Sequence, residues 1–338
     1  MTIARGREAA PRGLRWFRAD AARLRGGARR LDHEVTETVT TTALRGADCR
    51  LPTLAFVGAG RAGTALAAAA HAAGYRVTAV ASRTPASAHR LAAAVQATPV
   101  AGPVAAAMSA DLTVLTVPDA AVTRLAAVLA ASGMSLGGRG VLHCSGALDR
   151  SALAAVRQVA AAAGAVHPLA SLAGAAGAAA LRGSFFAVDA DPVLRPWLER
   201  LVEDLGGIPF AAARLDRALY HAAAVLAGNA PLALLERATT LLRAAGVDAR
   251  VAEEALTSLL LGAVANARRL GVRAALTGPV VRNDAGTVAR HLRALEHDPA
   301  SQELYHHLAC ETLAVSGVDG RDEVAAVLAS PPRLRATA

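Results

Sequence analysis

From residue 51 onward, short apolar runs alternate with alanine-rich stretches of helical spacing. The clearest apolar runs have the length and composition of buried strands and cover residues 54–57, 112–117 and 140–143. Helical stretches lie between these runs, and a further helix is expected over residues 151–163. Because strands and helices alternate with short connections, we predict an α/β domain with a doubly wound parallel sheet over residues 51–213.

The pattern changes near residue 214, where the extended runs stop. Apolar positions with helical spacing then fill four long stretches, at residues 215–245, 250–270, 284–295 and 301–316. One more short helix is expected over residues 321–329. We therefore predict that residues 214–330 form a second domain, which is all-α.

Residues 1–50 lack a sustained apolar period and are rich in arginine. They contain 11 of the 36 basic residues and 6 of the 27 acidic residues. They show no apolar segment of the kind found in secretory signals. We expect residues 1–50 to form a flexible extension, and the protein to be cytoplasmic and not associated with a membrane.

All basic residues are arginines, and the sequence contains no lysine. This excludes the lysine chemistry of Schiff-base enzymes, P-loop proteins and kinases. The net charge of +9 is partly clustered in residues 1–50 without a recognition motif, so no nucleic-acid partner is predicted. The three cysteines are widely spaced and predict neither a metal site nor a disulfide framework.

The apolar run at residues 54–57 leads directly into a GxGxxG motif. Gly58 permits a tight turn, Gly60 lets a pyrophosphate approach the backbone, and Gly63 lets the next helix pack closely on the strand. The N-terminus of that helix offers free N–H groups to the anion. A purely structural turn is the alternative, but the order strand, loop, helix, strand favours a Rossmann dinucleotide site formed by Gly58, Ala59, Gly60, Arg61, Ala62 and Gly63.

The end of the second strand indicates which dinucleotide binds. NAD sites usually carry an acidic residue there, which binds the ribose 2′-hydroxyl. Here Ser82, Arg83 and Thr84 supply hydroxyls and a guanidinium that suit a 2′-phosphate, although Arg83 could also be a solvated loop residue. We predict NADP(H) in preference to NAD(H). The ends of the next two strands are expected to add three contacts, from Val117, Pro118 and Ser145.

The predicted substrate side combines strand ends with the first long helix of the second domain. Ser145 and His167 follow strands and are expected to face the substrate, although His167 could instead pin a turn. His221 and Asn229 lie two helical turns apart on roughly one side. A histidine has a pKa suited to donating a proton during hydride addition, and an asparagine can orient the substrate. The alternative for His221 is a hydrogen-bonded core residue.

A Gly-Pro break precedes the last candidates, Arg282 and Asp284. Arg282 is predicted to hold a substrate carboxylate, because a guanidinium binds carboxylates bidentately, although it could also be a surface residue. Asp284 is placed either to cap the following helix or to line the substrate pocket.

Six motifs occur together in this order: GxGxxG, VPD at 117–119, HCSGA at 143–147, HP at 167–168, YHAAAVLAGN at 220–229 and GPVVRND at 278–284. Together they resemble a family of Rossmann-like oxidoreductases with a C-terminal domain of unknown function. That family is related to pyrroline-5-carboxylate reductase, ketopantoate reductase and the deazaflavin-dependent NADP reductases. The resemblance implies a helical domain like that of 6-phosphogluconate dehydrogenase, through which a homodimer forms. His221 departs from ketopantoate reductases, which carry a lysine there.

We therefore expect an NADPH-dependent reductase. Its substrate would be a small carboxylate-bearing ketone or imine, such as a 2-oxo acid like ketopantoate or an imine like a pyrroline carboxylate. In this interpretation His221 protonates, Asn229 orients and Arg282 holds the carboxylate. A non-catalytic NADP(H)-binding sensor or scaffold is the alternative, because the usual lysine is missing.

Overall fold

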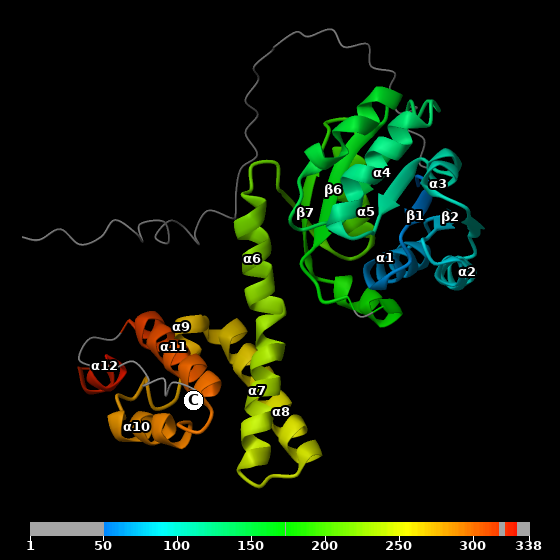
Figure 1. Cartoon of the computed structure of the whole chain (residues 1–338). Coiled ribbons are helices and arrows are strands. Elements are labelled where there is room, and N and C mark those ends of the chain that lie inside the picture. The colour runs from blue at the N-terminus through cyan, green and yellow to red at the C-terminus, as the bar shows by residue number, and fades with distance from the viewer. Residues whose placement is uncertain (1–50, 173, 318–321, 330–338) are drawn as a thin grey trace, which may run out of the picture. The chain divides into compact units, whose positions relative to one another are not determined.

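A computed structural model describes residues 51–172, 174–317 and 322–329 of the chain. The predicted extension of residues 1–50 lies outside these described residues, as does residue 330. The described part begins with an eight-stranded sheet in the order β3-β2-β1-β4-β5-β6-β7-β8 (Figure 1). The strands are β1 (Leu54–Val57), β2 (Val77–Ala81), β3 (Thr98–Val100), β4 (Leu112–Leu115), β5 (Gly140–His143), β6 (Ala162–Pro168), β7 (Phe185–Ala190) and β8 (Ile208–Ala211).

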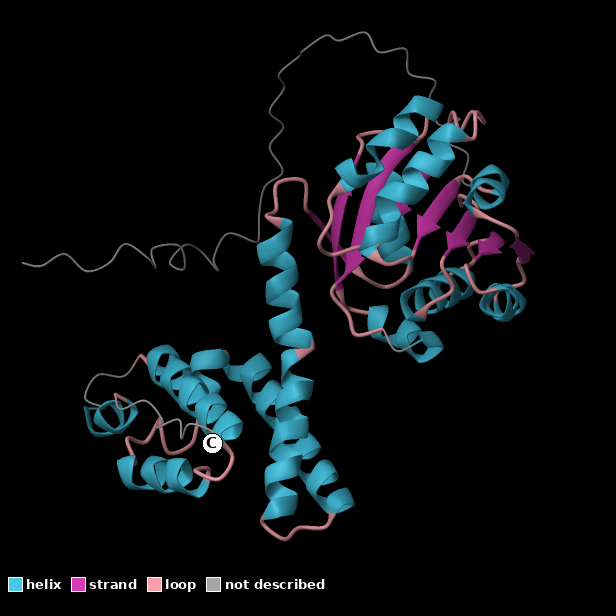
Figure 2. Cartoon of the chain, viewed as in Figure 1, coloured by secondary structure: helices cyan, strands magenta, loops and turns pink. Residues whose placement is uncertain are grey.

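Helices cover both faces of the sheet, which confirms the predicted doubly wound α/β architecture (Figure 2). They are α1 (Arg61–Ala72), α2 (Pro85–Ala94), α3 (Pro103–Ser109), α4 (Asp119–Ala131), the 3-10 helices η1 (Arg150–Val159) and η2 (Gly174–Leu181), and α5 (Arg195–Asp204). Leu66 of α1 and Leu198 of α5 belong to the core on one face, and Val122 of α4 and Leu153 of η1 to the core on the other.

The sheet is parallel from β3 to β6, but β7 runs antiparallel to β6 and β8 runs parallel to β7. The predicted parallel sheet is therefore confirmed for β1 to β6, whereas β7 and β8 run in the opposite direction. A parallel crossover must return the chain to the opposite end of the sheet. The connection from β6 to β7 contains the 3-10 helix η2. The chain therefore starts β7 at the same end of the sheet at which β6 finishes, and the two strands run antiparallel.

The helix expected over residues 151–163 is wrong for its last four residues. The 3-10 helix η1 ends at Val159, Ala160 follows in the left-handed conformation with φ 59°, and β6 begins at Ala162. This strand pairs with β5 on one side and β7 on the other. Its alanine-rich sequence has a high helix propensity, but pairing on both sides within the sheet overrides that preference.

The described residues beyond β8 form only helices, as predicted. They are α6 (Arg217–Gly228), α7 (Ala230–Ala244), α8 (Ala249–Leu270), α9 (Val272–Ala275), α10 (Ala285–Ala294), α11 (Pro299–Ser316) and α12 (Asp322–Leu328). The single helix expected over residues 215–245 is interrupted at Asn229, two residues before Pro231. Four aspartates precede helices and accept hydrogen bonds from first-turn N–H groups: Asp216, Asp248, Asp284 and Asp298.

Helices α10 to α12 share a small core that includes Val288 and Val324. In contrast, α7 has no buried residue and α8 has only Ala252. Among the described residues, one helical segment, Arg217–Ala244, is long and apolar enough to cross a membrane. That judgement rests on its 28 residues and mean hydropathy of 1.4, and none of the apolar window is buried in the structure.

Candidate functional site

The three glycines of the GxGxxG motif have three different environments. Gly58 has φ +113°, and a Cβ there would lie 2.3 Å from the carbonyl oxygen of Thr116. A Cβ on Gly63 would lie 2.1 Å from the carbonyl oxygen of Gly58. A Cβ on Gly60 would meet nothing within 4 Å. The first and third glycines are therefore required by the fold, whereas Gly60 leaves space beside the backbone for a ligand.

Gly60 is the N-cap of α1, and no side chain accepts a hydrogen bond from the first turn of this helix. The first turn also contains no acidic residue. The N-terminus of this 12-residue helix therefore presents N–H groups and the positive end of its dipole to the open space at Gly60. The Thr116 hydroxyl fixes the loop by donating a hydrogen bond to the carbonyl oxygen of Gly58 at 2.7 Å. These features fit the pyrophosphate of a dinucleotide.

The loop after β2 lies beside the glycine loop, because the N–H of Gly58 donates to the carbonyl of Ala81 at 2.8 Å. Ser82 is half-buried, whereas Arg83 and Thr84 are exposed. The sequence contains no aspartate or glutamate between residues 51 and 110. A ribose 2′-hydroxyl would thus find no carboxylate from this stretch, whereas a 2′-phosphate would find a free guanidinium.

The other predicted cofactor residues follow the neighbouring strands. Val117 and Pro118 come after β4, and the N–H of Thr116 bonds to the carbonyl of Val57 at 2.9 Å. Ser145 comes after β5 and is buried. Its hydroxyl oxygen accepts hydrogen bonds from two backbone N–H groups of the same turn, each at 3.2 Å. The structure therefore brings the predicted cofactor residues to the carboxyl ends of adjacent strands, where open α/β sheets bind ligands.

A second group of polar side chains joins β6 to α6. The His167 Nδ1 atom lies 2.7 Å from the hydroxyl oxygen of Tyr220, and the His167 and His221 rings meet edge to face at 5.9 Å. A Cβ on Gly146 would lie 2.6 Å from His221 Nδ1 and 2.8 Å from His167 Nε2. The missing side chain of Gly146 therefore lets two imidazole nitrogens approach the same point. We refer to His167, Tyr220 and His221 as the imidazole–phenol cluster.

Two members of this neighbourhood were not among the predicted site residues. Tyr220 stands next to His221 in the sequence, and that proximity was the available signal. Arg217, one helical turn before His221, is buried, and its guanidinium nitrogens make no hydrogen bond within the described residues. Nothing in the local sequence distinguishes Arg217 from the exposed arginines.

Three other predicted residues lie away from the cluster in the described chain. Asn229 is exposed at the break between α6 and α7, about 12 Å along the helix axis from His221. Arg282 is exposed in the turn before α10. Asp284 caps α10 by accepting from the Thr287 N–H at 2.9 Å and the Thr287 hydroxyl at 2.7 Å. These bonds support the capping alternative for Asp284, and they hold the pKa of its carboxyl below the usual value.

His167 is uncharged at neutral pH. Burial, together with the neighbouring His221 and Arg217, lowers the pKa of His167 to about 4. A neutral imidazole can accept a hydrogen bond from the Tyr220 hydroxyl at Nδ1. It then carries its own proton on Nε2, next to Gly146. The cluster thus holds exchangeable protons at the carboxyl end of the parallel strands, the same end at which the glycine loop follows β1.

The low pKa of His167 predicts a pH dependence of stability. Between pH 6.5 and about 4 the unfolded chain binds a proton that folded His167 does not, so the free energy of unfolding should fall as the pH drops. The full contribution is present above pH 6.5 and amounts to about 3 kcal/mol. Urea unfolding of the wild type and of His167→Gln at pH 7 and pH 4.5 measures it. Equal losses in both proteins would contradict the prediction.

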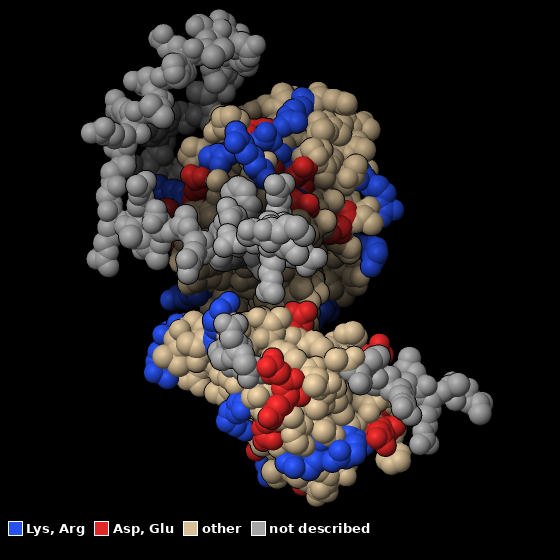
Figure 3. Space-filling view, turned by 90° about the vertical axis from the view of Figure 1, so that its left-hand side faces the viewer, with Lys and Arg blue, Asp and Glu red and all other residues tan. Residues whose placement is uncertain are grey.

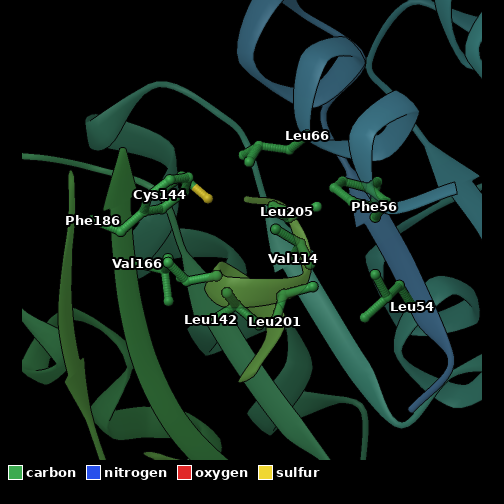
Figure 4. Close-up of a pocket in the computed structure, with 12 residues that line it drawn as sticks. Leu54, Phe56, Leu66, Val114, Leu142, Cys144, Val166, Phe186, Leu201 and Leu205 are labelled. Atoms are coloured by element: carbon green, nitrogen blue, oxygen red, sulfur yellow. The ribbon is translucent and has the colours of Figure 1, made fainter. Parts of the chain in front are cut away.

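A small cavity of about 20 Å³ lies within the core between the sheet and α1 (Figure 4). Its lining is apolar, including Phe56, Val114 and the thiol of Cys144. Burial raises the pKa of Cys144 to about 12, so this thiol stays protonated at neutral pH and is a poor nucleophile. The cavity is too small for a substrate.

Charges of both signs are interspersed on the face drawn in Figure 3. Ion pairs also join arginines to acidic residues within the described chain, such as Arg157 with Asp191 at 2.6 Å and Arg200 with Asp204 at 3.5 Å. This arrangement differs from the single-sign stripe by which proteins follow a nucleic-acid backbone.

Two family profiles match the chain. Residues 36–168 match the Rossmann-like domain, and residues 184–312 match a domain of unknown function, DUF2520. Their order and positions confirm the resemblance drawn from the sequence motifs. No curated protein matches the sequence.

Solved structures confirm the same fold. A Bacteroides fragilis protein assigned as an NADP oxidoreductase has a TM-score of 0.64 and 23% identity, over 78% of this chain and 98% of that one. An imine reductase from a Pseudomonas species has a TM-score of 0.57 and 18% identity, over 82% and 99% of the chains. A Plasmodium falciparum pyrroline carboxylate reductase with NADP bound has a TM-score of 0.53 and 13% identity, over 79% and 98%.

Proposed function

The chain belongs to the proteins that combine a Rossmann-like domain with a DUF2520 domain, and from that premise we propose that it is an NADPH-dependent reductase. Its substrate would be a small ketone or imine that carries a carboxylate. One observation carries this proposal. A proton-holding cluster lies at the carboxyl end of the same sheet whose first turn forms an open phosphate cradle.

The two phosphate-bearing parts of NADPH each find a fitting group. Gly60 and the uncapped N-terminus of α1 suit the pyrophosphate, and the exposed Arg83 suits the 2′-phosphate. When bound, NADPH supplies a hydride to the carbon of a C=O or C=N group. Two of the structural neighbours, one assigned as an NADP oxidoreductase and the other a pyrroline carboxylate reductase with NADP bound, support the same choice of cofactor.

The protein's own task is to supply a proton and orient the acceptor. We assign the proton donor to His221, which is half-buried and therefore within reach of a bound substrate. The hydrogen-bonded pair of Tyr220 and His167 packs against it and fixes the adjoining ring. The roles that the sequence predicts for Asn229 and Arg282 are not part of this proposal, because both residues are exposed and Asn229 lies about 12 Å along the helix axis from His221.

The cofactor assignment predicts the effect of Arg83→Ala. Loss of the guanidinium should weaken NADPH binding about 30-fold, or about 2 kcal/mol, and leave NADH binding unchanged. Fluorescence titrations of the purified protein with each nucleotide measure this difference. Arg90→Ala is the matched control, because Arg90 is an exposed arginine of α2 whose recorded hydrogen bond is to Ser87. An unchanged NADPH affinity in Arg83→Ala would reject this site.

A non-catalytic sensor or scaffold would bind NADP(H) equally well. The two functions differ in whether NADPH is consumed when 2-oxo acids or cyclic imino acids are added. Oxidation of NADPH with any of these compounds supports the reductase. Tight binding with no oxidation across the series supports the sensor.

We also propose that the protein is a cytoplasmic homodimer formed through the helical part. Seven large apolar side chains there keep more than half of their surface exposed: Leu219, Leu226, Leu232, Leu259, Leu261, Val264 and Val272. Exposed apolar surface of this extent is typical of a site that binds another protein or a membrane. Charges of both signs are interleaved on the same helices, such as Arg237 and Glu254, and they suit a second copy better than lipid chains.

Light scattering of the full chain tests the dimer. The expected mass is about twice 34.2 kDa, and the double variant Leu226→Asp with Leu259→Asp should shift it to the monomer value. Val128→Asp is the control, since Val128 is a similarly exposed apolar residue of α4. A monomeric wild type, or one that binds lipid vesicles through this surface, would refute the dimer.

A further inference from the structure

Arg217 is the first residue of α6 and is the only buried arginine among the described residues. Only 7% of its side chain is exposed, and none of its three guanidinium nitrogens makes a hydrogen bond. The nearest recorded carboxylate belongs to Asp189 on β7, at 3.9 Å from Nη2. Burying a guanidinium without hydrogen bonds lowers the stability of the folded state. We therefore expect this arginine to serve a function other than stabilising the fold.

Asp189 does not neutralise Arg217 alone, because it is shared. Its carboxylate also accepts from the Arg150 backbone N–H at 3.1 Å and lies 3.3 Å from Arg150 Nη1. Arg150 and Arg157 in turn share Asp191. Three arginines therefore meet two aspartates, and a positive charge remains beside the sheet.

This charge lies next to the imidazole–phenol cluster. Arg217, Tyr220 and His221 have the i, i+3, i+4 spacing that places side chains on one face of a helix. The guanidinium carbon is 5.9 Å from the centre of the Tyr220 ring, within the range of a cation–π contact. The hydroxyl of the same ring is bonded to His167. The polar atoms of Arg217 are shielded from solvent, so it acts on the cluster and not on a ligand.

We propose that Arg217 is a positioning residue for the reduction, held by Asp189 and acting through Tyr220 and His167 without touching the substrate. This inference rests on the proposed function. In the sheet register, Asp189 opposes Ala165, and Ala165 lies beside His143. The Arg217 guanidinium thus pairs with a residue of β7 whose partner in the sheet belongs to β6, the strand that carries His167.

A fixed positive charge at this place has two effects. It disfavours a second proton on His167, so the ring stays able to accept the Tyr220 hydroxyl proton. It also favours negative charge that develops nearby during hydride addition. Besides burial, the groups that face His167 are His221 and Arg217 on α6, His143 on β5 and Asp119 on α4; only Asp119 favours the charged ring.

The test compares Arg217→Met with Arg217→Lys and Arg150→Met in the full chain. NMR of isotope-labelled histidines follows the titration of His167, assigned through His167→Gln. We expect Arg217→Met to raise the midpoint by about one pH unit and lower kcat about 10-fold with KM unchanged. Arg217→Lys should restore most of both. Arg150→Met, which removes the other arginine on Asp189 and with it the surplus positive charge, should shift the midpoint in the same direction as Arg217→Met. Arg237→Met, at an exposed arginine that pairs with Asp298, should change neither. Arg217→Gln serves as a second neutral variant if Arg217→Met does not fold.

Two results would overturn the inference. An unchanged His167 midpoint in the neutral variants would remove the link between Arg217 and the cluster. A raised KM for a carboxylate substrate, with none for its methyl ester, would mean that Arg217 contacts the substrate directly. If no variant and no wild type turns over any substrate, the proposed function fails, but the histidine titration still decides the role of Arg217.

Discussion

Gly60→Ser should weaken NADPH binding about 100-fold, or about 3 kcal/mol, without lowering the thermal unfolding temperature. Gly60 has an extended conformation, and a Cβ there meets nothing within 4 Å. Serine is also a favourable N-cap, so its hydroxyl can bond the first-turn N–H groups of α1. The same side chain would occupy the space where a pyrophosphate must approach. Nucleotide titration and calorimetry together measure the two effects.

The chain offers matched controls for this substitution. Gly102 is the N-cap of α3 and also has open space around its missing Cβ, so Gly102→Ser should leave NADPH affinity unchanged. Gly63→Ala should behave in the opposite way and destabilise the fold, because its Cβ would lie 2.1 Å from the Gly58 oxygen. Normal NADPH affinity in Gly60→Ser would show that the dinucleotide does not use this loop.

His221→Gln should lower kcat about 100-fold, or about 3 kcal/mol, while NADPH affinity stays unchanged. Glutamine keeps a polar side chain of similar length but cannot supply a proton at neutral pH. The fold should tolerate the change, because the buried Nδ1 of His221 has no hydrogen-bond partner to lose. Steady-state turnover with the substrate found in the screen measures the effect.

His291→Gln is the control for His221→Gln. His291 lies on α10 and bonds to Tyr305 at 2.8 Å, with a ring geometry close to that of His167 and Tyr220. His291→Gln therefore measures how much kcat changes when a histidine bonded to a tyrosine is lost from a helix outside the sheet. Full turnover in His221→Gln would take His221 out of the proton path and transfer the candidate role to the Tyr220–His167 pair.

Elements that depend on neighbours in the sequence were predicted well. The strands at 54–57 and 140–143 have the predicted bounds, and the glycine loop has the predicted turn. The helix α10 begins after Asp284, as the capping alternative required. These features follow from glycine stereochemistry, apolar runs and capping, all of which act within a few residues.

Elements that depend on distant partners were predicted less well. Residues 162 and 163 were expected to end a helix but begin β6, because β5 pairs with them in the sheet. The direction of β7 depends on which edge of the sheet the chain re-enters. Neither fact can be deduced from local propensity, since the pairing strands are separate in the sequence.

The sequence by itself determined the α/β and all-α halves and the glycine turn, and the cofactor preference that we propose also rests on it. Only the tertiary structure decided the surroundings of the candidate site. His167 and Tyr220 are 53 positions apart and meet because α6 packs beside the end of β6. The burial of Arg217 beside Asp189 likewise depends on contacts between remote segments. Motifs record local conformation, whereas burial and charge environment arise only when the chain is folded.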